Sequence, residues 1–336
     1  MSANVEGRPA EDGSSRIPSH RSRVVAALSI GLASAVFTGI VFTVTRIPPD
    51  FEFWWRGAQL FLSGVNPYHA TPRGPLWPLP DPLFYPLPSI LFSFPLAPLP
   101  LPVAGALFMG LSGGLLAWFI TRDGLWRLVI FVSAPYLMAL RFGQWSPLLS
   151  VVALVPAAGW LAAMKPNLGL AVLCYRPSWR AVTGCALVGL VSMVALPSWP
   201  IDWHSNLNAL VGHPPPILTP IGPLLLLALL RWRRPETRLL LAMACVPQLL
   251  FFADQFPLFL IPNTPKEAST LSACSFVAFF IWLGRLGTTE HYVAMAATGV
   301  LWSTYVPCLV MVLMRPNKAP SERATEATSL SLETIS

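Results

Sequence analysis

Long apolar runs separated by short polar loops make up most of the chain and predict an all-α polytopic membrane protein. The first run, residues 24–45, can cross a bilayer, because about 20 helical residues span about 30 Å of hydrocarbon. Further runs lie at residues 101–120, 125–140, 147–164, 181–196, 217–230, 239–252, 271–286 and 292–314. Shorter apolar runs at 86–100, 167–175 and 256–262 allow one more span. We therefore expect a bundle of about nine to ten transmembrane helices.

Both ends of the chain lack this apolar pattern. Residues 1–20 are polar and mixed in charge, and residues 316–336 are rich in Ser, Thr, Ala and Glu, as disordered tails are. We expect a disordered cytoplasmic tail (1–20), a transmembrane domain (21–315) and a disordered C-terminal tail (316–336). The basic start also fits a secretory signal peptide, but the first apolar run continues well beyond a possible cleavage site at residues 33–35, which favours an uncleaved anchor.

Basic residues are distributed unevenly between alternate loops, and this asymmetry predicts the orientation of the chain. With a cytoplasmic N-terminus, the inner loops hold Arg122, Arg127, Lys165, Arg176, Arg180, Arg231, Arg233, Arg234, Arg238 and Arg285. The outer loops hold Arg46, Arg56, Arg73, Arg141 and Lys266, and nine spans would also place Arg315 outside. We expect a multi-pass protein of the inner (plasma) membrane whose active site is extracytoplasmic.

Acidic residues sort between the two sides in the same topology. Asp123 and Glu236 fall in inner loops. The outer carboxylates, which are the candidate bases for chemistry on that side, are Asp50, Glu52, Asp81, Asp202, Asp254 and Glu267.

Composition agrees with the pattern. Hydrophobic residues make up 54% and charged residues 11% of the chain, and the mean hydropathy is +0.59, which excludes an ordinary soluble domain. The net charge of +7 arises from separate loops rather than from a continuous basic face, so we expect a lipid bilayer and no nucleic acid as partner. The five cysteines lie in or beside apolar runs without CxxC spacing, which indicates packing.

The first outer loop places two carboxylates beside an aromatic cluster. Asp50 follows two prolines and is a suitable N-cap for a helix over residues 51–63 that ends at Gly64. Apolar side chains of this segment fall on one stripe at helical spacing, with Trp54 and Phe61 among them. We expect an amphipathic helix that lies in the membrane interface with these rings toward lipid.

Two roles for Asp50 are open at this point. As an N-cap, with Glu52 complementing the helix dipole, it would stabilise the helix by about 1–2 kcal/mol. As a general base, it would need a partly desolvated pocket that raises its pKa toward the working pH. Glu52 cannot form a close acid pair with it, because side chains two positions apart on a helix diverge by about 200°.

Four motifs in sequence order resemble those of glycosyltransferase family 87. The first runs from Asp50 to Tyr68 and includes paired tryptophans, Ala58, Gly64, Asn66 and Pro67. The others are Phe-Tyr-Pro-Leu-Pro at 84–88 with the proline-rich run 95–100, Gly-Gln-Trp-Ser-Pro-Leu-Leu at 143–149, and the run 159–166 that ends in Lys-Pro. Together they cover about residues 50–179.

The resemblance implies a GT-C type fold with an outward-facing cavity. It implies transfer of a sugar, of the mannose or arabinose class, from a polyprenyl-phosphate donor to a glycan or glycolipid acceptor of the cell envelope, with inversion at the anomeric carbon. Asp50 matches the family's catalytic aspartate.

Several other residues are predicted to bind substrate. Arg56 and Arg141 are candidates to meet the leaving lipid phosphate, with Arg56 favoured, although Arg56 could equally anchor its helix at the interface. Lys165 matches the family spacing, but the topology puts it near the cytoplasmic side unless a broken hairpin at Pro166 folds it into the cavity. The remaining predicted substrate-binding residues are Glu52, Asn66, Tyr68, Tyr85, Gln144 and His204. No Asp/His spacing suggests a metal site, and no cofactor is expected.

Two other classes of protein remain open. The chain has no counterpart of the Asn-Gln-Ser stretch that many family members carry in a later outer loop, and it is shorter than usual for the family. Both features fit a catalytically silent membrane subunit or assembly factor on the same fold. A transporter is less favoured, because the interrupted spans do not recur in two halves as inverted repeats would.

Overall fold

The computed structural model describes residues 18–45, 47–208, 214–285 and 292–315. The predicted tails, apart from residues 18–20, and Arg46 lie outside these residues. Within them every regular element is a helix and no strand occurs. Three helices, His20–Val44, Leu101–Asp123 and Ala294–Met314, are long and apolar enough to cross a membrane, and two bent helix pairs raise the number to five if each is one span. An all-α protein with apolar spans is therefore confirmed, whereas the expected number of nine to ten spans is not.

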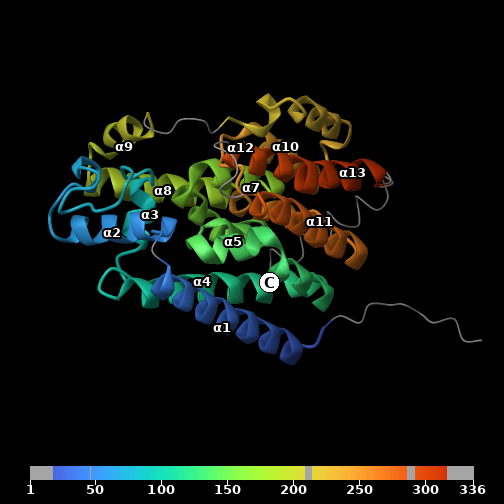
Figure 1. The fold of residues 1–336 in the computed structure, drawn as a ribbon, viewed down its shortest axis with the longest axis horizontal. Coiled ribbons are helices and arrows are strands. Elements are labelled where there is room, and N and C mark those ends of the chain that lie inside the picture. The colour runs from blue at the N-terminus through green and yellow to red at the C-terminus, as the bar shows by residue number, and fades with distance from the viewer. Residues whose placement is uncertain (1–17, 46, 209–213, 286–291, 316–336) are drawn as a thin grey trace, which may run out of the picture.

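The elements follow one another along the chain as a series of long and short helices (Figure 1). The α-helices are α1 (His20–Val44), α2 (Asp50–Leu62), α3 (Leu87–Phe92), α4 (Leu101–Ile120), α5 (Ala134–Phe142), α6 (Ser146–Leu154), α7 (Pro166–Tyr175), α8 (Trp179–Ala195), α9 (Trp199–Leu207), α10 (Pro235–Cys245), α11 (Pro265–Leu283), α12 (Tyr292–Val300) and α13 (Val306–Met314). The 3-10 segments are η1 (Pro67–His69), η2 (Thr121–Asp123), η3 (Leu125–Val132), η4 (Pro156–Met164), η5 (Pro216–Leu218), η6 (Gly222–Arg231) and η7 (Ala253–Leu260), and a π-helical turn, η8 (Leu301–Tyr305), joins α12 to α13.

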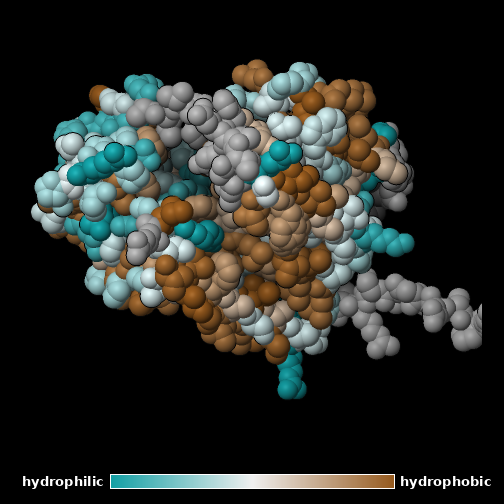
Figure 2. Space-filling model, in the orientation of Figure 1, coloured by the Kyte–Doolittle hydropathy of each residue, from teal (hydrophilic) through white to brown (hydrophobic). Residues whose placement is uncertain are grey.

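Helices α1 and α4 lie side by side along one face of the protein (Figure 1). A Cβ added at Gly31 would lie 3.0 Å from the Gly110 carbonyl oxygen, so the two backbones approach closely there. Small residues supply van der Waals packing between helices in lipid, where the hydrophobic effect does not drive association. Large apolar side chains such as Leu28 and Leu32 are exposed on α1. Figure 2 shows apolar residues over this face and hydrophilic residues at the end that carries α2, α3 and α9.

Proline explains why several expected spans are short or broken helices. The run expected at 147–164 is divided into α6 and η4 at Pro156, and the run expected at 239–252 ends as α10 at Cys245, shortly before Pro247. Proline removes a backbone donor and clashes with the preceding turn, so a helix stops or tightens there. A hydropathy profile detects a long apolar run but does not detect where proline interrupts the helix within it.

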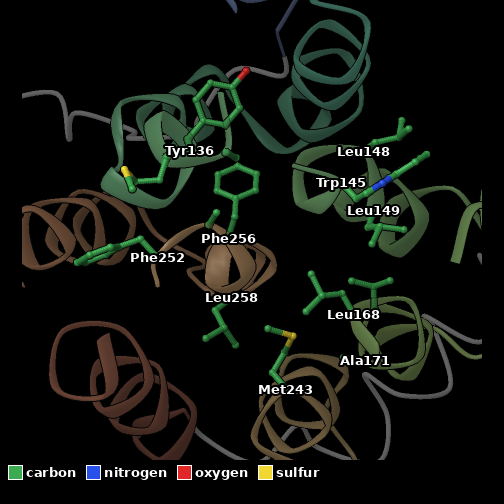
Figure 3. Close-up of a cluster of buried hydrophobic side chains, with 14 of the residues drawn as sticks. Tyr136, Trp145, Leu148, Leu149, Leu168, Ala171, Met243, Phe252, Phe256 and Leu258 are labelled. Atoms are coloured by element: carbon green, nitrogen blue, oxygen red, sulfur yellow. The ribbon is translucent and has the colours of Figure 1, made fainter. Parts of the chain in front are cut away.

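Segment η7 runs through the centre of the protein although it is a 3-10 helix with Pro257 inside it. All of its residues are buried. Figure 3 shows Phe256 of η7 facing Tyr136 of α5, and Leu258 facing Met243 of α10. Irregular helices at such depth are tolerated only where protein covers them, and η7 meets that condition.

A charged cluster lies at the end of the bundle opposite α2, where α13 ends (Figure 1). Arg315 pairs with Glu267 at 2.9 Å and with Glu236 at 3.4 Å. Arg315 and Arg127 also donate hydrogen bonds to the successive carbonyls of residues 261–262, at 2.7 and 2.6 Å. We call this group the Arg315 cluster.

The Arg315 cluster corrects part of the predicted topology. Glu267 was expected on the outer side and Glu236 on the inner side, but both contact Arg315. That expectation is wrong, and α11, which carries Lys266 and Glu267 in its first turn, begins at the same end as α10. Segment η7, too short to count as a span, leads into this end, where the carbonyls that follow it accept from Arg315 and Arg127.

Candidate functional site

Four polar side chains from four separate segments form one hydrogen-bonded chain. The Gln144 Nε2 donates to Oδ2 of Asp50, and the Lys165 Nζ donates to Oε1 of Gln144 at 2.9 Å. The same Lys165 Nζ forms an ion pair with Oδ1 of Asp254 at 2.6 Å. We call these four residues the Asp50 network. In order, the network links the Asp50 carboxylate, the Gln144 amide, the Lys165 ammonium and the Asp254 carboxylate, which lie far apart in the chain.

Asp50 begins α2 and does not cap it. The N-cap is Pro49, in an extended conformation, and no side chain caps the helix. The N-cap role expected for Asp50 is therefore wrong, and its carboxylate is free to accept from Gln144. As the first residue of α2 it still lies where the helix dipole favours negative charge.

The apolar face of α2 is covered by protein. Phe51, Trp54 and Ala58 are fully buried, and the Trp54 ring lies 4.7 Å from that of Trp145 and 4.8 Å from that of Phe108. The amphipathic pattern is confirmed, but the expectation that Trp54 faces lipid is wrong. Because buried rings on one face hold α2 in place, its first turn is a rigid platform for Asp50.

A glycine brings Gln144 to Asp50. Helix α5 ends at Gly143 in the left-handed conformation, with φ of 66°. A Cβ at this position would lie 2.6 Å from Cβ of Phe51, in the first turn of α2. Only glycine allows both the backbone turn and this close approach, and the next residue then faces Asp50. This is a physical reason for the Gly-Gln pair.

Lys165 stands at a break between two helices. Segment η4 ends at Met164, Pro166 begins α7, and Lys165 itself has φ −141° and ψ 83°. The expectation that Lys165 lies too far from Asp50 to reach its site is wrong, because Lys165 contacts Gln144, which donates to Asp50. The alternative, a broken hairpin at Pro166, is the arrangement observed, since a proline is well placed at the start of the returning helix.

Asp254 completes the network; the sequence predicted it only as one of six outer candidate bases and not as a substrate-binding residue. It follows a γ-turn at Phe252, which has φ 65° and ψ −61° and whose neighbours are joined by a 2.8 Å bond from the Ala253 N–H to the Phe251 carbonyl. This backbone conformation is rare and strained, and it is held by a buried ring that packs on Trp282. One signal was available in the sequence: a lysine drawn into an apolar protein needs an acidic partner.

The surroundings of Asp50 make it a weak acid. Burial is the largest cause and raises its pKa to about 6, and the negative charge of Asp254 adds to the increase. Lys165, the hydrogen bond from Gln144 and the nearby guanidinium of Arg141 lower the pKa, but together they do not offset burial. A carboxylate with this pKa can accept and release a proton near neutral pH.

Several hydrogen-bond donors on the segments that carry Asp50 and Gln144 have no partner. In the described part of the chain, Nη1 of Arg141 and the indole Nε1 atoms of Trp54 and Trp145 have no acceptor. Tyr85 lies beside Asp50, and burial raises its pKa well above the ordinary range, with further increases from Asp50 and Asp254, so its hydroxyl keeps its proton. Arg141, which lies close to Asp50, can donate to oxygen atoms of a ligand, whereas both indoles are fully buried among other rings and Tyr85 is hydrogen-bonded with Gln144.

Two predicted substrate-binding residues bind each other. Arg56 contacts Glu52 at 3.4 Å, one turn apart on α2, and its guanidinium lies 5.8 Å from the Trp55 ring. Both side chains are only partly buried. Neither belongs to the Asp50 network.

Asn66, Tyr68 and His204 belong to a neighbouring structure that docks α9. The Asn66 amide donates to Asp202 of α9 at 2.9 Å, and the Tyr68 hydroxyl donates to the Tyr85 carbonyl at 3.0 Å. His204 is exposed on α9. Asn66 therefore holds α9, Tyr68 positions the loop that carries Tyr85, and His204 takes no part in the Asp50 network.

The described residues also include candidate metal ligands and cysteines. They contain no group of three His, Cys, Asp or Glu side chains that could hold a metal ion. All five cysteines are free. Compared with protein-family models, with curated proteins and with solved structures, the chain gives no match.

Proposed function

We propose that the protein is a membrane glycosyltransferase that moves a sugar of the mannose or arabinose class from a polyprenyl-phosphate donor to an extracytoplasmic glycan or glycolipid acceptor. The transfer inverts the anomeric carbon, and Asp50 is the general base. The observation that carries the proposal is the Asp50 network, which holds a carboxylate with a pKa of about 6 at the start of a rigid helix. The four family-like motifs supply the reaction class, and three of them meet at this network.

The chemistry requires one base and one cation. The acceptor hydroxyl gives its proton to Asp50 as its oxygen bonds to the anomeric carbon, and the bond from that carbon to the lipid phosphate breaks. Gln144 engages only Oδ2 of Asp50, so Oδ1 can face the hydroxyl. The departing phosphate gains negative charge, which a guanidinium with unused donors can stabilise.

We assign the phosphate contact to Arg141 rather than to Arg56. Both guanidinium groups have one nitrogen without a partner, but Arg56 is paired with Glu52, whereas Arg141 lies close enough to Asp50 to lower its pKa.

Transfer from a radiolabelled polyprenyl-phosphate mannose or arabinose, by purified protein in lipid, tests the proposal. The Asp50→Asn variant should fold and lose transfer by about 100- to 10,000-fold, the range for a missing general base. Asp81→Asn, at an exposed loop acid, is the matched control and should keep full activity. Full activity of Asp50→Asn contradicts the mechanism. A wild-type protein that neither transfers nor hydrolyses any such donor supports the alternative of a silent subunit.

A further inference from the structure

Lysine can act only as a hydrogen-bond donor, and this property fixes the direction of the Asp50 network. Because the Lys165 ammonium faces Gln144 at 2.9 Å, the atom that receives it must be the amide oxygen. The amide nitrogen then points at Asp50. The reverse orientation would set the amide oxygen against the Asp50 carboxylate and the amide N–H groups against the ammonium, so Lys165 makes Gln144 a donor to Asp50.

Lys165 also couples the charges of two carboxylates, Asp50 and Asp254. Its ammonium lies between two carboxylates, with Asp254 in direct contact at 2.6 Å and Asp50 one amide away. The side chains of Lys165 and Asp254 are 14% and 7% exposed, so water screens the pair little. Asp254 therefore offsets part of the positive charge that would otherwise stabilise an ionised Asp50.

We propose that Asp254 is a positioning residue that controls the acidity of Asp50 through Lys165. With Asp254 in place, the network keeps Asp50 a strong enough base to take a proton from a hydroxyl. Without the Asp254 charge, Lys165 would act on Asp50 alone and hold it ionised as a weaker base. This inference deepens the proposed function and rests on that function only for its catalytic consequence.

The other charged and titratable groups around Asp50 do not give this control. Arg141 faces it from α5, and Tyr85 faces it from the loop before α3 with its hydroxyl protonated. Glu52, on the same helix, is paired with Arg56. Only Lys165 has a second carboxylate that can switch its effect on Asp50.

Substitutions at Asp254 and at Lys165 should shift the pKa of Asp50 in opposite directions. Asp254→Asn leaves the Lys165 charge unopposed, so the Asp50 pKa should fall. Lys165→Met leaves the Asp254 charge unopposed, so the Asp50 pKa should rise. The double variant Lys165→Met/Asp254→Asn has neither charge, and its Asp50 pKa should lie between those of the single variants. A purely structural role would change folding in both variants and would not reverse the sign.

The test is an infrared pH titration of the protonated carboxyl band, assigned to Asp50 by its loss in Asp50→Asn. The wild-type midpoint should lie at about pH 6. Each single variant should move the midpoint by about one pH unit or more, a tenfold change in proton affinity. Asp254→Glu, which keeps the charge, should restore the wild-type value, and Asp81→Asn should leave it unchanged.

The outcomes separate this inference from the proposed function. Midpoints that stay fixed, or that move in the same direction in Asp254→Asn and Lys165→Met, overturn the inference even if the protein transfers sugar. Opposite shifts in a protein without transfer activity support the inference and contradict the proposed function. If Asp254→Asn does not fold, the comparison of Lys165→Met with the double variant decides, because adding Asp254→Asn should then lower the midpoint.

Discussion

Breaking the Lys165–Asp254 ion pair should reveal a large coupling between two positions 89 residues apart. Lys165→Met leaves a carboxylate that is 7% exposed without its counter-ion, and Asp254→Asn leaves an ammonium that is 14% exposed without its own. Removing one partner of a buried pair costs about 3–5 kcal/mol, whereas replacing both is often close to neutral. Each single variant should therefore lose about 3–5 kcal/mol, and the double variant should recover most of the loss.

Equilibrium unfolding in mixed micelles at neutral pH, with all four members of the double-mutant cycle, measures this coupling. Lys266→Met, at an exposed lysine, is the control and should change the free energy of unfolding by less than about 0.5 kcal/mol. If the two single effects add to within about 0.5 kcal/mol, the residues do not interact. That result would refute the ion pair and return Lys165 to the cytoplasmic position that the hydropathy pattern predicts.

The remaining predictions concern pH, packing and topology. With Asp50 active as a carboxylate of pKa about 6, kcat/KM for transfer should fall tenfold per pH unit below about pH 6, and a profile flat to pH 5 would contradict this. Gly143→Ala should destabilise the protein by more than about 1 kcal/mol. By contrast Gly189→Ala, with no neighbour within 4 Å of the added Cβ, should stabilise it by about 0.5–1 kcal/mol, and equal effects in thermal unfolding would oppose the account. In a cysteine-free background, cysteines at Lys266 and His204 should react with impermeant thiol reagents from opposite sides of the membrane, and labelling from one side would contradict the position of α11.

The fold could be predicted as far as local signals allow. The α1 run has no proline and no charge in its apolar part, so its hydropathy alone predicts a long helix. Around η7, prolines and a γ-turn shorten the helices, and burial is supplied by distant segments such as α5 and α10. Hydropathy along the sequence does not detect this burial, so it predicts more spans than the three to five found among the described residues and separates Glu267 from Glu236.

The site residues likewise divide into those that the sequence predicted and those that it did not. Asp50 and Gln144 were predicted because each lies in a short motif that resembles family 87, and Asp50 also stands beside an aromatic cluster in the first predicted outer loop. Lys165 was expected far from Asp50 because its position depends on a chain reversal. Asp254 was predicted only as one of six candidate bases, because its contact with Lys165 joins positions 89 residues apart. Long-range charge compensation leaves no local pattern, although the need for it can be inferred once a lysine is known to be buried.

The central claim, that Asp50 is the base for transfer from a polyprenyl-phosphate sugar, is tested most directly by single-turnover transfer in wild type and Asp50→Asn, with donor binding measured in the same samples. The account predicts a rate at least about 100-fold lower in the variant, with donor affinity within a few-fold of wild type. Transfer at the wild-type rate would contradict the claim. A loss confined to donor binding, with the rate from bound donor unchanged, would contradict it as well.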